Sequence, residues 1–169
     1  TREDAPALFA EIHHHLGVIY SEIPDEAKKK SIWAAVSSSS FQEALQYFTQ
    51  ENDPYNYALI CNSFGNALTK YPAAVHSDNI AKALFYYQEA LNIRTAHQYP
   101  LERTLTLLNY LEAAWNLSLP EDDFHLDHYT GMVEKAREVL ELTDDPLFQQ
   151  RAQQHLDKLD ALKAIYQNA

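Results

Sequence analysis

The sequence predicts an all-helical protein built from antiparallel helical hairpins, and three observations support this. Glycine is scarce, at 3 of 169 residues, while Ala, Leu, Glu, Gln and Lys fill long stretches. These side chains lose little rotamer freedom in a helix. Prolines recur at nearly equal intervals, and between them small and large apolar residues follow each other one helical turn apart. No convincing pair of strands is visible.

The helix starts are marked by proline. Four segments open in this way, at Pro6, Pro54, Pro100 and Pro146, with separations of 48, 46 and 46 residues. Proline suits the first helical turn because its missing N–H has no intrahelical partner there and its φ is already helical. Asp53 and Asp145 stand directly before two of the prolines, where a carboxylate can accept the unpaired backbone N–H groups. Each proline therefore predicts the first arm of a hairpin.

A large apolar residue follows each proline by 10 or 11 positions. These residues are Leu16, Phe64, Leu111 and Leu156, and we expect them to be buried.

Second arms are predicted where a small residue precedes a large apolar one by four positions, on the same helix face. Such pairs occur at Ala44 and Phe48, Ala83 and Tyr87, and Ala136 and Leu140. The predicted helices are 6–22, 39–51, 54–70, 77–96, 100–117, 126–142 and 146–167, with 24–40, 71–76 and 119–125 as insertions between arms. We expect a single domain over 1–169, with hairpins 6–52, 54–96 and 100–142 and a polar capping helix 146–167.

The residues of the first two hairpins resemble the tetratricopeptide repeat. The likeness lies in Leu16-Gly17-Val18-Ile19-Tyr20, in Asn62 to Ala67, in Ala83 to Ala90, and in Asn92 to Thr95 followed by Tyr99 to Glu102. The pattern looks like the long-period tetratricopeptide arrays common in cyanobacteria and other filamentous bacteria. The period of 46 to 48 residues exceeds the usual ~34. In the third hairpin, Glu112 takes the place expected for glycine, which predicts wider helix spacing there.

This resemblance implies a right-handed superhelical stack of three repeats and a cap, an α-solenoid whose first arms line a concave groove. Such a protein would act as a scaffold or adaptor that binds another protein or a peptide. Carried over by position, the groove residues are His14 and Val18, Asn62 and Asn66, Asn109 and Ala113, and Gln154 and Lys158. Arg151 adds a positive charge at the C-terminal end of the groove. Asparagine offers a donor and an acceptor, which suits the backbone of an extended peptide.

Composition narrows the partners and the compartment. A formal charge of -11 disfavours DNA and RNA, whose backbone phosphates must be neutralised by Lys and Arg. The apolar stretches are shorter than the ~18 residues of a membrane span, and the N-terminus lacks the order of a signal peptide. The single cysteine, Cys61, cannot form an internal disulfide. We expect a cytoplasmic protein without a cofactor.

Catalytic patterns are weak, so we expect no enzyme. His13, His14 and His15 point about 100° apart on a helix and cannot converge on one ion. Cys61 lies among apolar residues and predicts an inert, buried thiol. His125 and His128 share a helix face near the acidic residues Asp122, Asp123 and Asp127, but no third ligand stands at a recognisable spacing. A metal-dependent enzyme using this pair is the alternative from another class.

A second alternative is self-association. Ile32, Trp33 and Val36 form an apolar patch in the segment predicted as an insertion. Such a patch can dock on a second copy, which would make the protein a homo-oligomer.

Overall fold

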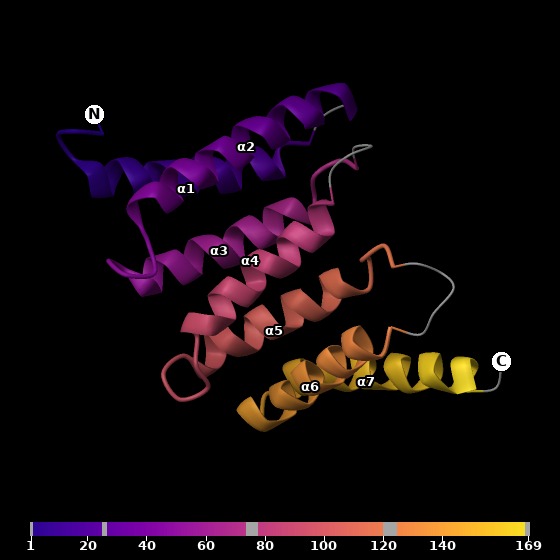
Figure 1. Ribbon diagram of the computed structural model, residues 1–169. Coiled ribbons are helices and arrows are strands. Elements are labelled where there is room, and N and C mark those ends of the chain that lie inside the picture. Colours follow the sequence, from indigo (N-terminus) through magenta and orange to yellow (C-terminus); the bar gives the residue numbers. More distant parts are fainter. Residues whose placement is uncertain (1, 25–26, 74–77, 120–124, 168–169) are drawn as a thin grey trace. The chain divides into compact units, whose positions relative to one another are not determined.

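The computed structural model describes residues 2–24, 27–73, 78–119 and 125–167. In those ranges every regular element is an α-helix, which confirms the predicted all-helical class. The helices are α1 (Pro6–Glu22), α2 (Ala27–Tyr47), α3 (Pro54–Leu68), α4 (Asn79–Ile93), α5 (Pro100–Ala114), α6 (Leu126–Leu142) and α7 (Pro146–Gln167) (Figure 1). Within each of two compact units neighbouring helices pack on one another, which is compatible with an α-solenoid.

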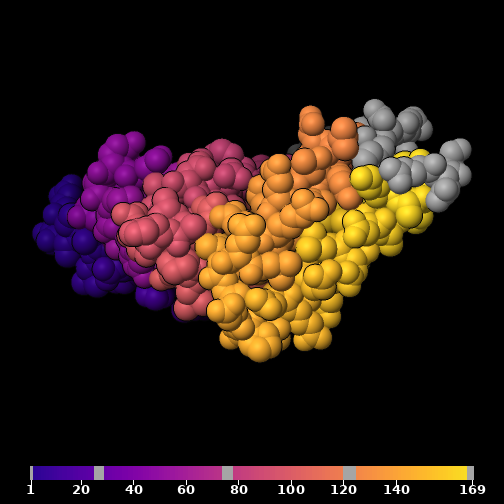
Figure 2. Space-filling model, turned by 90° about the horizontal axis from the view of Figure 1, so that it is seen from below, coloured from indigo at the N-terminus to yellow at the C-terminus, as the bar shows by residue number. Residues whose placement is uncertain are grey.

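The chain divides into two compact units, Thr1–Ile93 and Arg94–Ala169. In the first unit α1 packs along α2, α3 packs along α4, and α3 also contacts α1 and α2. In the second unit α6 packs on both α5 and α7, and Figure 2 shows the orange α6 side by side with the yellow α7. A single repeat domain over 1–169 stays a prediction.

The helix starts follow the sequence signals. Pro6, Pro54, Pro100 and Pro146 each open a helix. Asp53 caps α3 by accepting a hydrogen bond from the Asn56 backbone N–H at 3.1 Å, and Asp145 accepts one from the Leu147 N–H at 2.8 Å. The predicted ranges 6–22, 126–142 and 146–167 match the observed helices. The predictions 54–70 and 100–117 run past Leu68 and Ala114 because short turns end α3 and α5 there.

The second arm of the first hairpin was predicted wrongly. Helix α2 begins at Ala27 and not near residue 39, so most of the predicted insertion 24–40 is helical. The serine run misled the prediction because serine usually favours caps and turns. Here the Ser40 hydroxyl donates to the Val36 carbonyl at 2.9 Å, and the buried Ser37 hydroxyl donates to the Gly17 carbonyl at 2.5 Å. These small side chains stay hydrogen-bonded and let α1 approach α2 closely.

Two glycines mark the closest approaches of first and second arms. A Cβ atom added at Gly17 would lie 2.8 Å from the ring of Phe41, and one added at Gly65 would lie 2.5 Å from the ring of Tyr87. Ala44, Ala83 and Ala136 are also fully buried, as predicted for close helix contacts. In the third hairpin the position 11 residues after the proline is Leu111, which is buried, while Glu112 is exposed. Glu112 therefore does not stand in the place of the glycine.

Of the four large apolar residues that we expected to be buried after each proline, two are buried. Phe64 and Leu111 are buried, at 2% and 0% exposure. Leu16 and Leu156 are only half-buried, because Gly17 takes the inner position in α1 and Ala152, His155 and Leu159 take it in α7. The inner face of each of these helices is thus turned by one residue or more from the predicted one.

Candidate functional site

The first unit contains a groove between α2 and α4, with a volume of about 700 Å³. Both walls are supported from below by α3, against which α2 and α4 each pack. The lining residues come from α2 (Ser31, Ala34, Ala35, Ser38, Gln42), from α3 and the residues after it (Phe64, Leu68, Tyr71, Pro72), and from α4 (Asn79, Ala81, Lys82, Phe85, Tyr86).

The two walls differ in size. On α2 four of the five lining side chains are small, and Ala34 and Ala35 lie one turn from Ser38 on one face. On α4 the wall is aromatic: Phe85 is 57% exposed and meets the ring of Tyr86 edge-on at 5.2 Å between centroids. The ring of Phe64 in the floor lies 4.5 Å from Tyr86. A small wall facing an aromatic one leaves room for side chains of another molecule.

Charge is sparse in this groove. No described lining residue is a carboxylate, and Lys82 supplies the ionised group. This is unusual for a chain that carries a formal charge of -11.

A smaller hollow of about 260 Å³ adjoins the groove and shares Ala34, Tyr71 and Pro72 with it. Lys30 lines this hollow, where Trp33 stacks on Tyr20 at 5.5 Å between ring centroids. Lys70 also lies there, but it is ion-paired with Glu22.

Tyr71 joins the groove to the core. Its hydroxyl donates to the Ser37 hydroxyl oxygen at 2.7 Å, and Ser37 in turn donates to the Gly17 carbonyl. Burial raises the pKa of Tyr71 to about 12, so it stays a neutral donor at physiological pH. This hydrogen-bonded chain holds one end of the groove in place before anything binds.

The residues that the sequence predicts for the concave face of the first unit lie on α1 and α3, which pack together, and none of them lines the α2/α4 groove. The amide oxygen of Asn66 accepts a hydrogen bond from the Tyr87 hydroxyl at 2.8 Å. It therefore joins α3 to α4 within the hairpin. Asn62 is half-buried.

His14 is half-buried beside Phe41, 6.1 Å away between ring centroids. Its Nε2 atom is buried and has no hydrogen-bond partner among the described residues. Burial, together with the neighbouring His15, lowers the pKa of His14 to about 4. His14 is therefore neutral at physiological pH.

In the second unit the predicted residues lie on α5 and α7, which contact each other. Arg151 is ion-paired with Glu112, and the Lys158 ammonium lies 6.0 Å from the centre of the Trp115 ring. Gln154 is exposed, and Asn109 is half-buried. Arg151 and Lys158 thus help to join α7 to α5.

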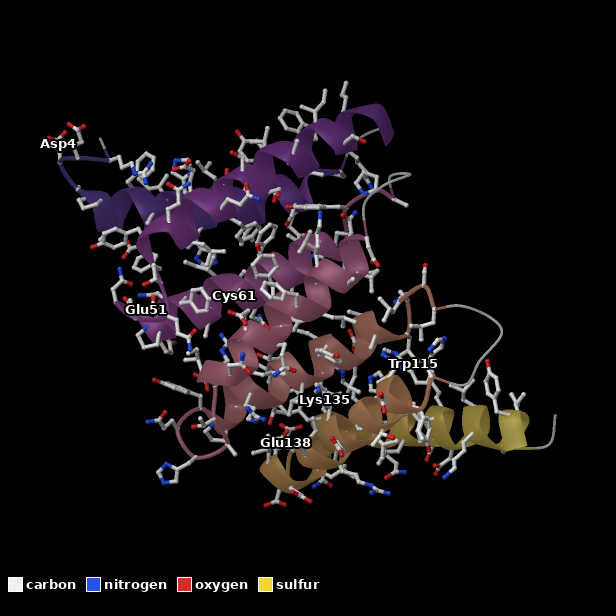
Figure 3. All side chains as sticks on the ribbon, viewed as in Figure 1. Asp4, Glu51, Cys61, Trp115, Lys135 and Glu138 are labelled. Carbon is white, nitrogen blue, oxygen red and sulfur yellow. The ribbon has the colours of Figure 1, made fainter. Side chains whose placement is uncertain are left out.

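Trp115 makes a further contact with α7. Its indole Nε1 donates to Nδ1 of His155 at 2.8 Å. Figure 3 shows Trp115 near the end of α5.

The patch predicted for self-association lies on α2. Ile32 is 59% exposed, whereas Trp33 and Val36 are half-buried. Because Trp33 stacks on Tyr20, the exposed apolar part of this patch is mainly Ile32.

The residues considered for metal binding and for nucleophilic catalysis lie in different parts of the chain. His125 and His128 are half-buried at the start of α6, and burial lowers the pKa of His128. Asp122 and Asp123 lie outside the described residues. In the described ranges no three His, Cys, Asp or Glu side chains are grouped so that they could hold a metal ion. Cys61 is fully buried, packed with Ala58 and Ala90 at the centre of the first unit (Figure 3).

The sequence did not predict the groove because most of its α2 wall lies in a segment that was not expected to be helical. Ser31, Ala34, Ala35, Ser38 and Gln42 follow helical spacing, but they fall within the segment predicted as an insertion. A helical interpretation of 27–47 would have revealed a face of small side chains.

No protein-family model matches this chain, and no curated protein or solved structure matches it significantly. The fold and the site define a class at the level of architecture: an all-helical protein of packed antiparallel hairpins that carries an apolar groove. In the part of the chain that the structure describes, no helix is both long and apolar enough to cross a lipid bilayer.

Proposed function

We propose that this chain is a protein-interaction module that binds a segment of another protein on its helical hairpins. The observation that carries the proposal is the groove between α2 and α4, which exposes Phe85 and excludes carboxylates in a strongly acidic chain. Exposed aromatic side chains in apolar hollows are the usual anchors of protein interfaces. The floor and walls come from three packed helices, so little ordering is needed on binding.

A tetratricopeptide-type array in a bacterial protein is part of this proposal. It is supported by the pairing of a first-arm glycine with a second-arm aromatic ring, which occurs at Gly17 and Phe41 and again at Gly65 and Tyr87. Repetition of the same close contact in successive hairpins is expected of a repeat protein, because each unit buries its face on its neighbours.

The concave face predicted from the sequence is the second candidate surface, with His14, Asn62 and Asn66 in the first unit and Asn109, Arg151, Gln154 and Lys158 in the second. We favour the α2/α4 groove because Asn66 and Arg151 already have partners inside the protein. Breaking such contacts to bind a ligand costs free energy, and binding in the groove does not require these contacts to break.

Photo-crosslinking from three exposed glutamines tests the proposal. A diazirine side chain is placed at Gln42, which lines the groove, at Gln154 on the predicted concave face, or at Gln50 in the turn after α2 as the control. After irradiation in extract of the source cells, we expect one protein to be attached through Gln42 and not through Gln50. Equal labelling from all three positions, or none, would contradict the proposal.

The same experiment distinguishes the alternatives. Attachment through Gln154 alone would move the site to the concave face. A product of two copies of this chain would support self-association, which Ile32→Glu should then abolish. Stoichiometric metal in the purified protein, found by elemental analysis and lost on His128→Ala, would support the metal-dependent enzyme instead.

A further inference from the structure

We infer that the occupant of the α2/α4 groove is an amphipathic α-helix with an apolar ridge and acidic residues beside it. This inference rests on the proposed function and adds the chemical class of the partner. It follows from three properties of the groove: the small side chains of its α2 wall, its mostly apolar surface and its charge.

The small side chains on the α2 side of the groove favour a helical binding partner. Ala34, Ala35 and Ser38 present little side-chain bulk, so a guest helix can approach α2 closely. Helices pack at about 8–10 Å between axes, and the smallest separations need small side chains at the contact. The lining positions from Ser31 to Gln42 extend over roughly 16 Å of α2, at about 1.5 Å per residue, which matches about three turns of guest helix.

An extended peptide fits less well. Its backbone N–H and C=O groups would need a continuous row of partners, whereas the groove exposes mostly apolar surface and its polar side chains Ser31, Ser38, Gln42, Asn79 and Lys82 are divided between two helices. Asn79, one of the amides present, already donates to the Pro72 carbonyl at 3.2 Å. A helix satisfies its own backbone hydrogen bonds and needs only apolar contacts, as in other grooves that accept helices.

The apolar ridge of the guest would meet the aromatic wall. Phe85 and Tyr86 face the small side chains of α2 across the groove, with Phe64 and Leu68 below. Leucine, methionine or phenylalanine side chains at positions i, i+3, i+4 and i+7 of a helix would reach this floor.

The charges around the groove predict which residues stand beside the apolar ridge of the bound helix. Lys82 lies at the groove, and Lys30 lies in the adjoining hollow. Glu22 also lines the hollow, but its carboxylate is paired there with Lys70, which leaves Lys30 as the additional cation. Asp78 caps α4 by accepting from the Ala81 N–H at 2.8 Å. Acidic residues beside the apolar ridge would therefore be attracted here, while basic residues would face Lys82.

Selection from a displayed peptide library tests this inference. The library holds 20-residue peptides with randomised residues in two backgrounds, one helix-forming and one proline-containing and extended, and the labelled full chain is the bait. We expect the enriched peptides to come from the helical background and to carry apolar residues at helical spacing with Asp or Glu beside them. Enrichment of extended peptides, of basic helices or of nothing would overturn the inference.

Variants of the chain show where the enriched peptides bind. Ala35→Trp fills the groove from an exposed position and should weaken binding at least tenfold, whereas Gln50→Trp, outside the groove, should leave it unchanged. Lys82→Glu should weaken acidic peptides by about three- to tenfold and restore binding of the same peptides with Lys in place of the acids. Arg137→Glu in the second unit is the matched charge control.

These results separate the two proposals. If the enriched peptides bind the Ala35→Trp variant as tightly as the parent chain, the inference is overturned. Attachment of a partner through Gln42 without enrichment of acidic helices would overturn the inference and leave the protein-interaction function standing. Acidic helices that need the groove, with no protein attached through Gln42, would contradict the function and leave the preference of the groove intact. Dimers of this chain that Ala35→Trp dissociates would make a second copy the occupant and overturn the inference.

Discussion

Tyr87 packs on Gly65 so closely that a Cβ atom at residue 65 would lie 2.5 Å from the ring. The ring cannot turn aside easily, because it is 1% exposed and its hydroxyl donates to Asn66 at 2.8 Å. One contact therefore sets the separation of α3 and α4, and it ties a residue predicted for the binding surface to the core.

Gly65→Ala should destabilise the protein in spite of the better helix propensity of alanine. Overpacking typically costs about 1–3 kcal/mol, and alanine recovers about 1 kcal/mol over glycine in a helix. Gly131→Ala in α6 is the matched control, because nothing lies within 4 Å of the added Cβ. Urea unfolding should show a loss for Gly65→Ala and a gain of up to about 1 kcal/mol for Gly131→Ala. Two gains would contradict the close contact.

Ala83→Leu should also overpack the α3/α4 hairpin, since Ala83 is fully buried. The expected loss is about 1–3 kcal/mol, visible as a lower thermal midpoint. An unchanged melting curve would argue against the alignment of the two helices.

Asn66→Ala should lower stability as well as any binding on that face. It removes the hydrogen bond between the Tyr87 hydroxyl and the Asn66 amide oxygen, and losing such a bond typically costs about 0.5–1.5 kcal/mol. In the Tyr87→Phe background the same substitution should cost much less. A double-mutant cycle by urea unfolding measures this coupling, and additive effects of the two substitutions would exclude it.

Glu138→Ala in α6 should destabilise the protein. The Glu138 carboxylate accepts hydrogen bonds from Arg103 Nε at 2.5 Å and Nη2 at 3.1 Å, joining α6 to α5. Both side chains are largely covered, at 20% and 29% exposure. We expect a loss of about 1–3 kcal/mol on thermal or urea unfolding. Glu134→Ala, at an exposed position of the same helix, should change stability far less.

Stability should fall on acidification because of His14. Its pKa is lowered from 6.5 to about 4 in the folded protein, so below about pH 6.5 the unfolded chain takes up a proton that the folded one does not. The contribution of His14 to the free energy of unfolding should therefore decrease from pH 6.5 to about pH 4 and change no further below that. Partial exposure limits the effect to about 1 kcal/mol at pH 5.

His14→Gln isolates this contribution, because His128 and His155, whose pKa values are also lowered by burial, act in the same direction. Urea unfolding at pH 7.5 and pH 5 should show a smaller acid loss for the variant than for the parent. Equal losses would exclude His14 as a source of the pH dependence.

Local signals in the chain were enough to predict the helices that begin at Pro6, Pro54, Pro100 and Pro146, since proline and the aspartates before two of them act within one turn. The helical class followed from composition for the same reason. The continuity of α2 through Ser37 to Ser40 was not predictable in this way, because serine has a poor helix propensity and Ser37 is satisfied by Gly17 on another helix.

Which residues are available to bind a partner was decided by the packing of the helices. Whether Asn66 and Arg151 can meet a partner is set by Tyr87 and Glu112, which lie 21 and 39 residues away in the chain, and no local pattern encodes such pairings. The groove likewise exists because α2 and α4, distant in sequence, both rest on α3 and leave small and aromatic walls facing each other. Helix starts reflect interactions within a turn, whereas an available surface is what remains after every long-range contact has formed.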